Sequence, residues 1–210
     1  MVMTLRRRSW RWFLVYLALA LAIGILVYGR PLLKQAFPIP FAEVILRAAE
    51  ETGTEPLLLV AIMRVESSFN PHAESPKGAK GLMQVMPSTG AWVAEQLGMS
   101  DFDVSRLEDP ETNIQIGAWY FAYLKNLFDD NTIAALAAYN GGLGNVQRWL
   151  REEIWSGQVD DLMNIPFPET RAYVQKVLST VEVYRMIHPE FAEEGFSWDA
   201  LKIQDLLNYR

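Results

Sequence analysis

The residue of this sequence best suited to acid–base chemistry is Glu66, which ends an apolar segment. If residues 56–67 form a helix, Leu59, Ile62 and Met63 lie on the same face as Glu66. Such neighbours would exclude water from the carboxyl group, which disfavours its charged form and raises its pKa. A carboxyl group that keeps its proton near neutral pH can act as a general acid. The same glutamate would do no chemistry if it simply pointed to solvent at a helix end.

The segment after Glu66 has the composition of a structured loop. Prolines at positions 71 and 76 and glycines at positions 78 and 81 disfavour a helix there. Residues 66–89 read E-S-S-F-N-P-H-A-E-S-P-K-G-A-K-G-L-M-Q-V-M-P-S-T. This stretch resembles the signature of the bacterial lytic transglycosylases of the soluble-lysozyme-like (Slt) type. The resemblance covers roughly residues 41–188 and continues in N-I-Q-I-G-A-W-Y-F-A-Y-L from Asn113, A-Y-N-G-G from Ala138 and E-T-R-A-Y-V from Glu169.

The resemblance implies an α-rich, lysozyme-like fold and a reaction on the glycan strands of peptidoglycan. Glu66 would first protonate the oxygen of the β-1,4 bond between N-acetylmuramic acid and N-acetylglucosamine. The resulting carboxylate would then accept the proton of the sugar's 6-hydroxyl, which gives a 1,6-anhydro product without water. Most glycosidases use two carboxyl groups, but Glu74, Asp101 and Asp103 occupy no motif position. One glutamate would therefore serve both steps.

The resemblance also implies a groove with a defined set of substrate-binding residues, namely Ser75, Gln84, Met86, Tyr139, Asn140, Glu169 and Tyr173. Four of these residues have a plainer alternative when they are considered alone. Ser75 precedes a proline and could form a turn, and Met86 could pack in a core. Tyr139 could be a buried tyrosine with a hydrogen-bonded hydroxyl. Glu169 could stabilise a helix end or form an ion pair.

Two other functions stay open on the residues alone. A hydrolytic lysozyme (muramidase) would use the same groove with water as the acceptor. A non-catalytic module would only bind glycan or act as a scaffold within an envelope complex. We favour the lytic transglycosylase because of the resemblance, and the intact E-S and G-L-M-Q segments argue against the non-catalytic module.

The composition argues against several other kinds of site. A chain without cysteine has no disulfide, no thiolate-bound zinc and no thiol nucleophile. Neither His72 nor His188 belongs to a metal-type cluster, so we expect no metal and no cofactor. Beyond residue 37 the chain carries 13 basic and 25 acidic residues. We do not expect such an acidic domain, which lacks a basic stripe, to bind nucleic acid.

The N-terminal segment has the pattern of a membrane anchor. Four arginines, at positions 6, 7, 8 and 11, precede the uncharged residues 12–28. This apolar run is at the short end for a bilayer-spanning helix, and the arginines would stay in the cytoplasm. It is longer than the usual core of a cleaved signal peptide, and no clear A-x-A site follows it. We therefore expect an uncleaved, single-pass anchor in the bacterial inner membrane, with the catalytic domain in the periplasm.

Three parts of the chain are expected: the arginine cluster, anchor and short spacer (1–37), a lysozyme-like transglycosylase domain (38–189) and a C-terminal tail (190–210). Periodicity and helix-end signals make the domain all-α, since no strand pattern occurs. The expected helices are 41–51, 56–67, 88–97, 109–128, 134–139, 145–155 and 170–187. Thr170 is the expected cap of the last of these, and Ser197 would cap a further helix in the tail.

Overall fold

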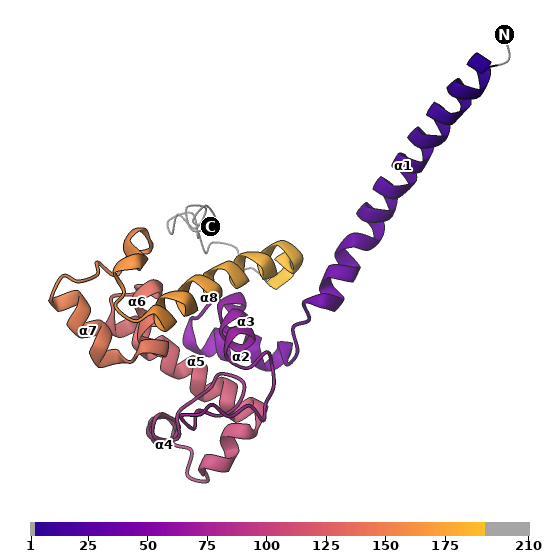
Figure 1. The fold of residues 1–210 in the computed structure, drawn as a ribbon. Helices are drawn as coiled ribbons and strands as arrows, with labels where there is room; N and C mark the ends of the chain where they lie inside the picture. The colour runs from indigo at the N-terminus through magenta and orange to yellow at the C-terminus, as the bar shows by residue number, and fades with distance from the viewer. Residues whose placement is uncertain (1–2, 192–210) are drawn as a thin grey trace. The chain divides into compact units, whose positions relative to one another are not determined.

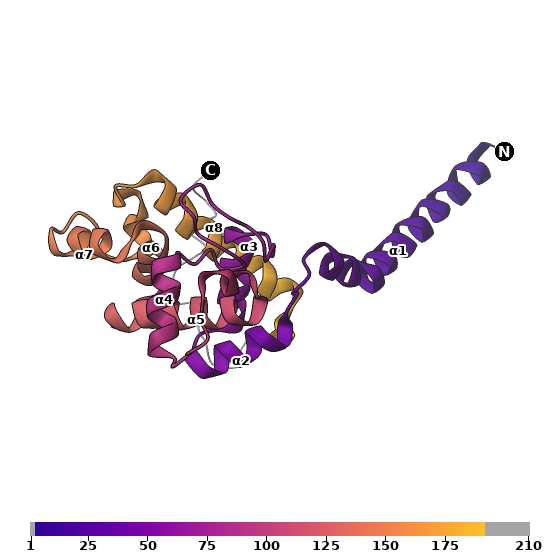
Figure 2. The ribbon, with the colours of Figure 1, turned by 90° about the horizontal axis from the view of Figure 1, so that it is seen from below.

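A computed structural model describes residues 3–191 of the chain (Figures 1 and 2). Internal contacts divide the chain into two compact units, with the boundary between Pro38 and Ile39. The described residues form helices and loops, with two isolated β-bridges and no strand. This confirms the all-α prediction for the part of the chain that the structure describes. The helix expected after Ser197 lies outside these residues.

The first unit is built on the helix α1 (Met3–Ala36), which contains Pro31. Over the described residues, no single helix is both long and apolar enough to cross a bilayer. Only together do two pieces of the N-terminal segment, Trp12–Gly24 and Val27–Ala36, have the length and apolar composition of a bilayer-spanning segment. These pieces are bent by 44° relative to each other.

The second unit contains seven described α-helices connected by loops and short 3-10 helices. Their bounds are α2 (Ala42–Thr52), α3 (Pro56–Glu66), α4 (Pro87–Gln96), α5 (Pro110–Leu127), α6 (Thr132–Gly141), α7 (Leu143–Arg151) and α8 (Pro168–Ile187). The 3-10 helices are η1 (Val104–Glu108), η2 (Val159–Asn164) and η3 (Pro189–Phe191). A proline lies in the first turn of α3, α4, α5 and α8, where its missing N–H group costs no hydrogen bond.

Several of the expected helix ends were wrong: α6 is longer at both ends than the expected 134–139, and α7 starts at Leu143 and not at residue 145. Helix α8 starts at Pro168, so Thr170 lies inside the first turn and is not the cap. Its buried hydroxyl instead donates to Asn140 Oδ1 at 2.9 Å. The helix expected over 145–155 ends at Arg151, because the backbone turns to a positive φ of 53° at Glu153.

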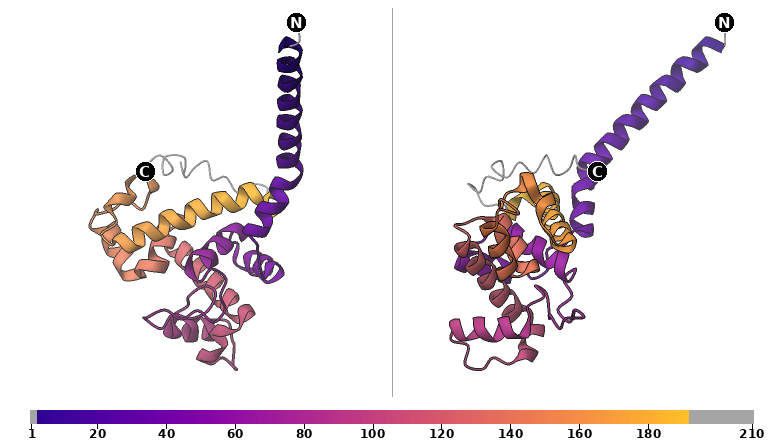
Figure 3. Two further views of the ribbon diagram at one scale, coloured as in Figure 1. Left: turned by 45° about the vertical axis from the view of Figure 1, so that its right-hand side comes forward. Right: turned by 60° about the vertical axis from the view of Figure 1, so that its left-hand side comes forward.

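Helix α3 is the centre of the second unit. All eight of its first residues, 56–63, are buried, so it has no solvent-facing side over that length. It packs mainly on α8, which also contacts α6 and runs across this unit (Figure 3). Full burial stabilises a leucine, isoleucine or methionine side chain by about 1.5–3 kcal/mol. The apolar helix that leads to Glu66 is therefore held firmly on its neighbours.

The loop after α3 is fastened to α5 by Asn113, which is fully buried. Its Oδ1 accepts from the backbone N–H of Met83 at 2.7 Å, and its Nδ2 donates to the carbonyls of Lys80 and Leu107 at 2.9 and 2.8 Å. Gly81 fits against this contact with a φ of 77°. A Cβ atom at Gly81 would lie 2.1 Å from the Leu107 carbonyl oxygen. The loop thus meets η1 and α5 at a point that has no room for a methyl group.

We predict that Gly81→Ala destabilises the protein far more than Gly98→Ala. Both glycines have a positive φ, but a Cβ atom at Gly98 would meet nothing within 4 Å. The left-handed backbone alone costs an alanine roughly 1–2 kcal/mol, which corresponds to a fall in Tm of about 2–8 °C for a domain of this size. Gly81→Ala adds a steric overlap with backbone, so its fall in Tm should be at least about twice as large. Thermal unfolding followed by circular dichroism compares the two variants. Equal losses would contradict the close packing at Gly81.

Candidate active site

Glu66 is the last residue of α3, and its carboxyl group has a strongly shifted pKa. Burial raises the pKa from its ordinary value of 4.5 to about 7. The Tyr173 hydroxyl acts in the opposite direction, Glu169 raises the pKa further through its charge, and Lys176 lowers it. The carboxyl group can therefore exchange a proton near neutral pH.

The cause of this shift agrees with the helical pattern. Leu59, Ile62 and Met63 are fully buried, and they occupy the turns of α3 that lead to Glu66. Desolvation by burial is the largest cause of the raised pKa. The predicted direction of the shift and its predicted cause are both confirmed.

Two tyrosines lie close to the Glu66 carboxyl group. Burial, and then the charge of Glu66, raise the pKa values of Tyr139 and Tyr173 well above the usual range, so both phenols stay neutral. The buried Tyr173 hydroxyl interacts with Glu66, although it makes no hydrogen bond of standard geometry. The Tyr139 hydroxyl donates to the Met83 carbonyl at 2.8 Å. Tyr173 is thus available to stabilise the carboxylate form of Glu66.

Both backbone polar groups of Met83 are hydrogen-bonded to side chains. Asn113 on α5 accepts from its N–H group, and Tyr139 on α6 donates to its carbonyl. A side chain from each of two helices therefore fixes this part of the loop beside Glu66. Sequence reasoning included Asn113 in the resemblance but gave it no role. The sequence offers little signal for this role, because the segment N-I-Q-I-G contains a second amide, Gln115.

The predicted residues Ser75, Gln84 and Met86 lie on the loop itself. Ser75 Oγ accepts from the backbone N–H of Ala79 at 3.0 Å. The Gln84 amide nitrogen donates to two carbonyls of the same loop, at 3.0 Å each, and its backbone has a φ of 49°. The Met86 side chain is exposed at the start of α4. The described polar contacts of Ser75 and Gln84 shape the loop, and the Gln84 amide oxygen is the part left for a ligand.

The predicted residues Asn140 and Glu169 lie where α6 ends and α8 begins. Asn140 Oδ1 accepts from Thr170, which joins the two helices. Glu169 is exposed beside it and interacts with Glu66 through its charge. Of the predicted binding residues, the structure therefore brings Tyr139, Glu169 and Tyr173 into electrostatic contact with Glu66. Sequence reasoning missed Lys176, which lies one helical turn beyond Tyr173 and acts on the same carboxyl group.

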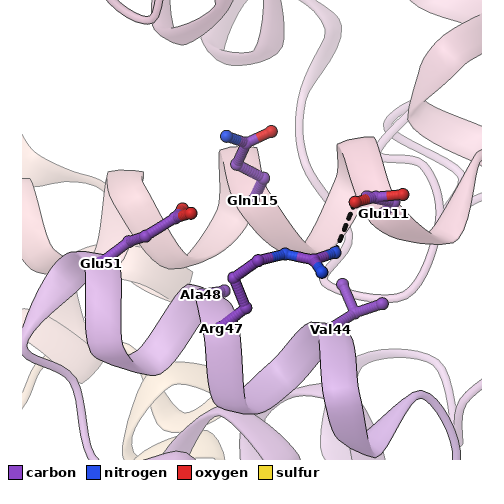
Figure 4. Close-up of a pocket in the computed structure, with 6 residues that line it drawn as sticks. All are labelled: Val44, Arg47, Ala48, Glu51, Glu111 and Gln115. Carbon is purple, nitrogen blue, oxygen red and sulfur yellow. Dashed lines mark hydrogen bonds and ion pairs between the residues drawn. The ribbon is translucent and has the colours of Figure 1, made fainter.

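Other parts of the domain offer weaker alternatives for a site. A pocket of about 210 Å³ lies between α2 and α5, and it contains none of the predicted site residues (Figure 4). Arg47 and Glu111 form an ion pair across it. In the described part of the chain, no group of three or more histidine, aspartate or glutamate side chains is arranged to hold a metal ion. Glu66 and its neighbours are thus the best-supported candidate.

Comparisons with known proteins agree with the resemblance in the sequence. Residues 43–160 match the family model described as the transglycosylase SLT domain. The soluble lytic murein transglycosylase of Salmonella typhimurium is 38% identical over 157 residues, which are 73% of this chain and 24% of that protein. Membrane-bound lytic murein transglycosylase C of Edwardsiella ictaluri is 34% identical over 177 residues, 70% of this chain and 47% of that protein.

A solved structure shares the fold of the second unit. The 70-kDa soluble lytic transglycosylase Slt70 of Escherichia coli superposes with a TM-score of 0.69 at 36% identity. The match covers 77% of this chain and 27% of Slt70. The chain therefore spans about a quarter of the length of the soluble relatives.

We predict that Glu66→Gln stabilises the protein at pH 8 and not at pH 4. The folded-state pKa of about 7 exceeds the ordinary value of 4.5, so the folded state loses stability as the pH rises through this window. Glutamine removes that loss, which amounts to at most about 3 kcal/mol. Thermal melts at both pH values test this, with the exposed Glu50→Gln as the matched control. A difference in Tm that does not change with pH would contradict the shifted pKa.

Proposed function

The chain belongs to the transglycosylase SLT family, and from this premise we propose that it is a lytic transglycosylase. Its substrate is the β-1,4 bond between N-acetylmuramic acid and N-acetylglucosamine in peptidoglycan. The observation that carries the proposal is the partly buried Glu66 carboxyl group with a pKa of about 7. The names of the curated relatives, which are lytic murein transglycosylases, support the same reaction.

In the first step, protonated Glu66 donates its proton to the glycosidic oxygen. The bond from that oxygen to C1 of the muramic acid breaks, and the N-acetylglucosamine leaves with its new hydroxyl. The acetamido group of the substrate assists by stabilising the positive charge that develops at C1. A general acid works best when its pKa lies near the working pH, as that of Glu66 does.

In the second step, the Glu66 carboxylate accepts the proton of the 6-hydroxyl of the same muramic acid. The freed oxygen forms a bond to C1, which closes the 1,6-anhydro ring and returns Glu66 to its protonated state. No water is consumed. Between the steps, the neutral hydroxyl of Tyr173 and the charge of Lys176 favour the carboxylate. The balance of these effects against burial keeps both protonation states accessible.

The remaining predicted residues would bind the sugars on either side of this bond. Met86 offers an exposed thioether to an apolar sugar face, and Glu169 offers an exposed carboxylate to sugar hydroxyls. Tyr139 and Asn140 end α6 beside Glu66, while Ser75, Gln84 and Tyr173 complete the set. Apolar surfaces with a few well-placed polar groups are typical of ligand sites.

We also propose that the N-terminal segment anchors the domain in the bacterial inner membrane, with the domain in the periplasm. The arginine cluster before residues 12–28 supports this orientation. A relative named as membrane-bound supports the location.

We predict that Glu66→Gln lowers turnover of purified peptidoglycan by about 10²–10⁴-fold, because the amide can neither donate nor accept the transferred proton. The unchanged chain should release products with 1,6-anhydro ends, identified by mass spectrometry, and Glu50→Gln should do the same. Reducing muramic acid ends would instead show a hydrolytic lysozyme. A folded Glu66→Gln protein with near-normal turnover would remove Glu66 from the mechanism. No release of products by the unchanged chain would favour the non-catalytic module.

For the anchor, we predict that the full chain sediments with membranes and withstands a high-salt wash. An apolar segment in the bilayer is not displaced by salt, whereas a surface charge interaction is screened. The measurement is fractionation of cells, combined with N-terminal sequencing. A mature chain that starts beyond Gly29 would show that the segment is a cleaved signal peptide.

A further inference from the structure

Four aromatic side chains form a cluster between α4 and α5. Trp92 on α4 lies 4.9 Å from Tyr123, 5.4 Å from Trp119 and 6.3 Å from Tyr120 on α5, measured between ring centroids. Trp119 and Tyr123 are nearly parallel, with 6° between their planes and 5.7 Å between their centroids. We refer to these four residues as the α4–α5 aromatic cluster.

This cluster lies at the surface of the domain and not in its core. All four side chains are partly exposed, whereas Val93 on α4 and Phe121 on α5 are fully buried. In the described structure, the indole N–H groups of Trp92 and Trp119 make no hydrogen bond and are not sealed from solvent. The cluster therefore presents apolar rings together with unused hydrogen-bond donors.

The cluster is continuous with the surroundings of Glu66. Tyr120 lies 5.7 Å from Tyr139, centroid to centroid. Tyr139 in turn interacts with Glu66 and holds the Met83 carbonyl. A row of aromatic rings thus leads from the carboxyl group through Tyr139 and Tyr120 to Trp92. Packing between α4 and α5 explains why the rings touch, but not why the two indole N–H donors beside this row have no hydrogen-bond partner in the described structure.

We propose that the α4–α5 aromatic cluster is a sugar-binding subsite for the part of the glycan strand beyond the bond that is cleaved. This rests on the proposed function. The C–H faces of a pyranose ring are apolar and pack on aromatic rings, and hydroxyl and acetamido oxygens accept from indole N–H groups. The occupant is a β-1,4-linked strand of N-acetylated hexosamines, because a polymer bound at Glu66 has to continue along one of the adjoining surfaces.

A subsite away from the cleaved bond predicts that binding depends on the length of the strand. The probes are β-1,4-linked N-acetylglucosamine trimer and hexamer, titrated calorimetrically into the full chain carrying Glu66→Gln, which keeps the probe intact. Adding Trp92→Leu or Trp119→Leu should weaken hexamer binding about tenfold, which corresponds to about 1.4 kcal/mol. Trimer binding should change less than twofold, because a trimer can be held next to Glu66 alone.

Controls separate the subsite from other causes. Trp92→Phe keeps a flat ring and should retain most of the hexamer affinity. Phe41→Leu replaces a partly exposed aromatic residue before α2, outside the cluster, and should leave the hexamer affinity unchanged. Melting temperatures identify any variant that has lost its fold, and in that case the ratio of hexamer to trimer affinity in the Glu66→Gln protein decides the outcome. Unchanged hexamer affinity in folded Trp92→Leu and Trp119→Leu proteins overturns the proposal, as does a hexamer that binds no better than the trimer. Failure of catalysis with peptidoglycan, while hexamer binding still depends on Trp92, would overturn the proposed function and leave the subsite.

Discussion

The structure depends on the way the backbone of Met83 is held. Its N–H group is bonded by a buried amide on α5, and its carbonyl is bonded by a tyrosine on α6. Backbone groups in a loop beside a hydrophobic core have to find such partners, since an unpaired buried group costs about 1–3 kcal/mol. The backbone conformation of the loop after α3 is therefore fixed at Met83. Glu66 ends an apolar helix where this loop begins, and burial there is the largest cause of its raised pKa.

The pKa of the Glu66 carboxyl group results from effects of opposite sign. Burial and the nearby Glu169 favour its protonated form, while Tyr173 and Lys176 favour its charged form. A site with burial alone would keep the proton too firmly, and a solvated site would lose it several pH units lower. Residues from α3 and α8 contribute to this balance, and these two helices pack on each other. The pKa therefore depends both on burial at the end of α3, which the local sequence predicts, and on charged and polar groups of α8, which only the tertiary fold brings near.

Much of the fold followed from local signals. Proline in the first turn and Asp109 as a cap located α5, and the apolar turns before Glu66 predicted its raised pKa. The wrong cap at Thr170 and the missed roles of Lys176 and Asn113 have a common cause. Thr170 has the side chain of a cap, but its hydroxyl is used by Asn140, thirty residues away in the chain. Lys176 acts on Glu66 of another helix, and Asn113 binds Met83 on the loop after α3. Such long-range pairings leave no periodic signal in the sequence, which is why they were missed.

Two parts of the loop after α3 differ in how closely they are packed. The Gly81–Met83 segment is enclosed by α5, α6 and η1, whereas Pro76 and Lys77 at the turn are exposed. Exposed turns tolerate inserted residues because loop-closure entropy grows slowly with length. Residues inserted at 76–77 would lengthen this exposed turn without moving Met83. The turn at 76–77 can thus accept new residues, in evolution or by engineering, whereas the Gly81–Met83 segment tolerates little change.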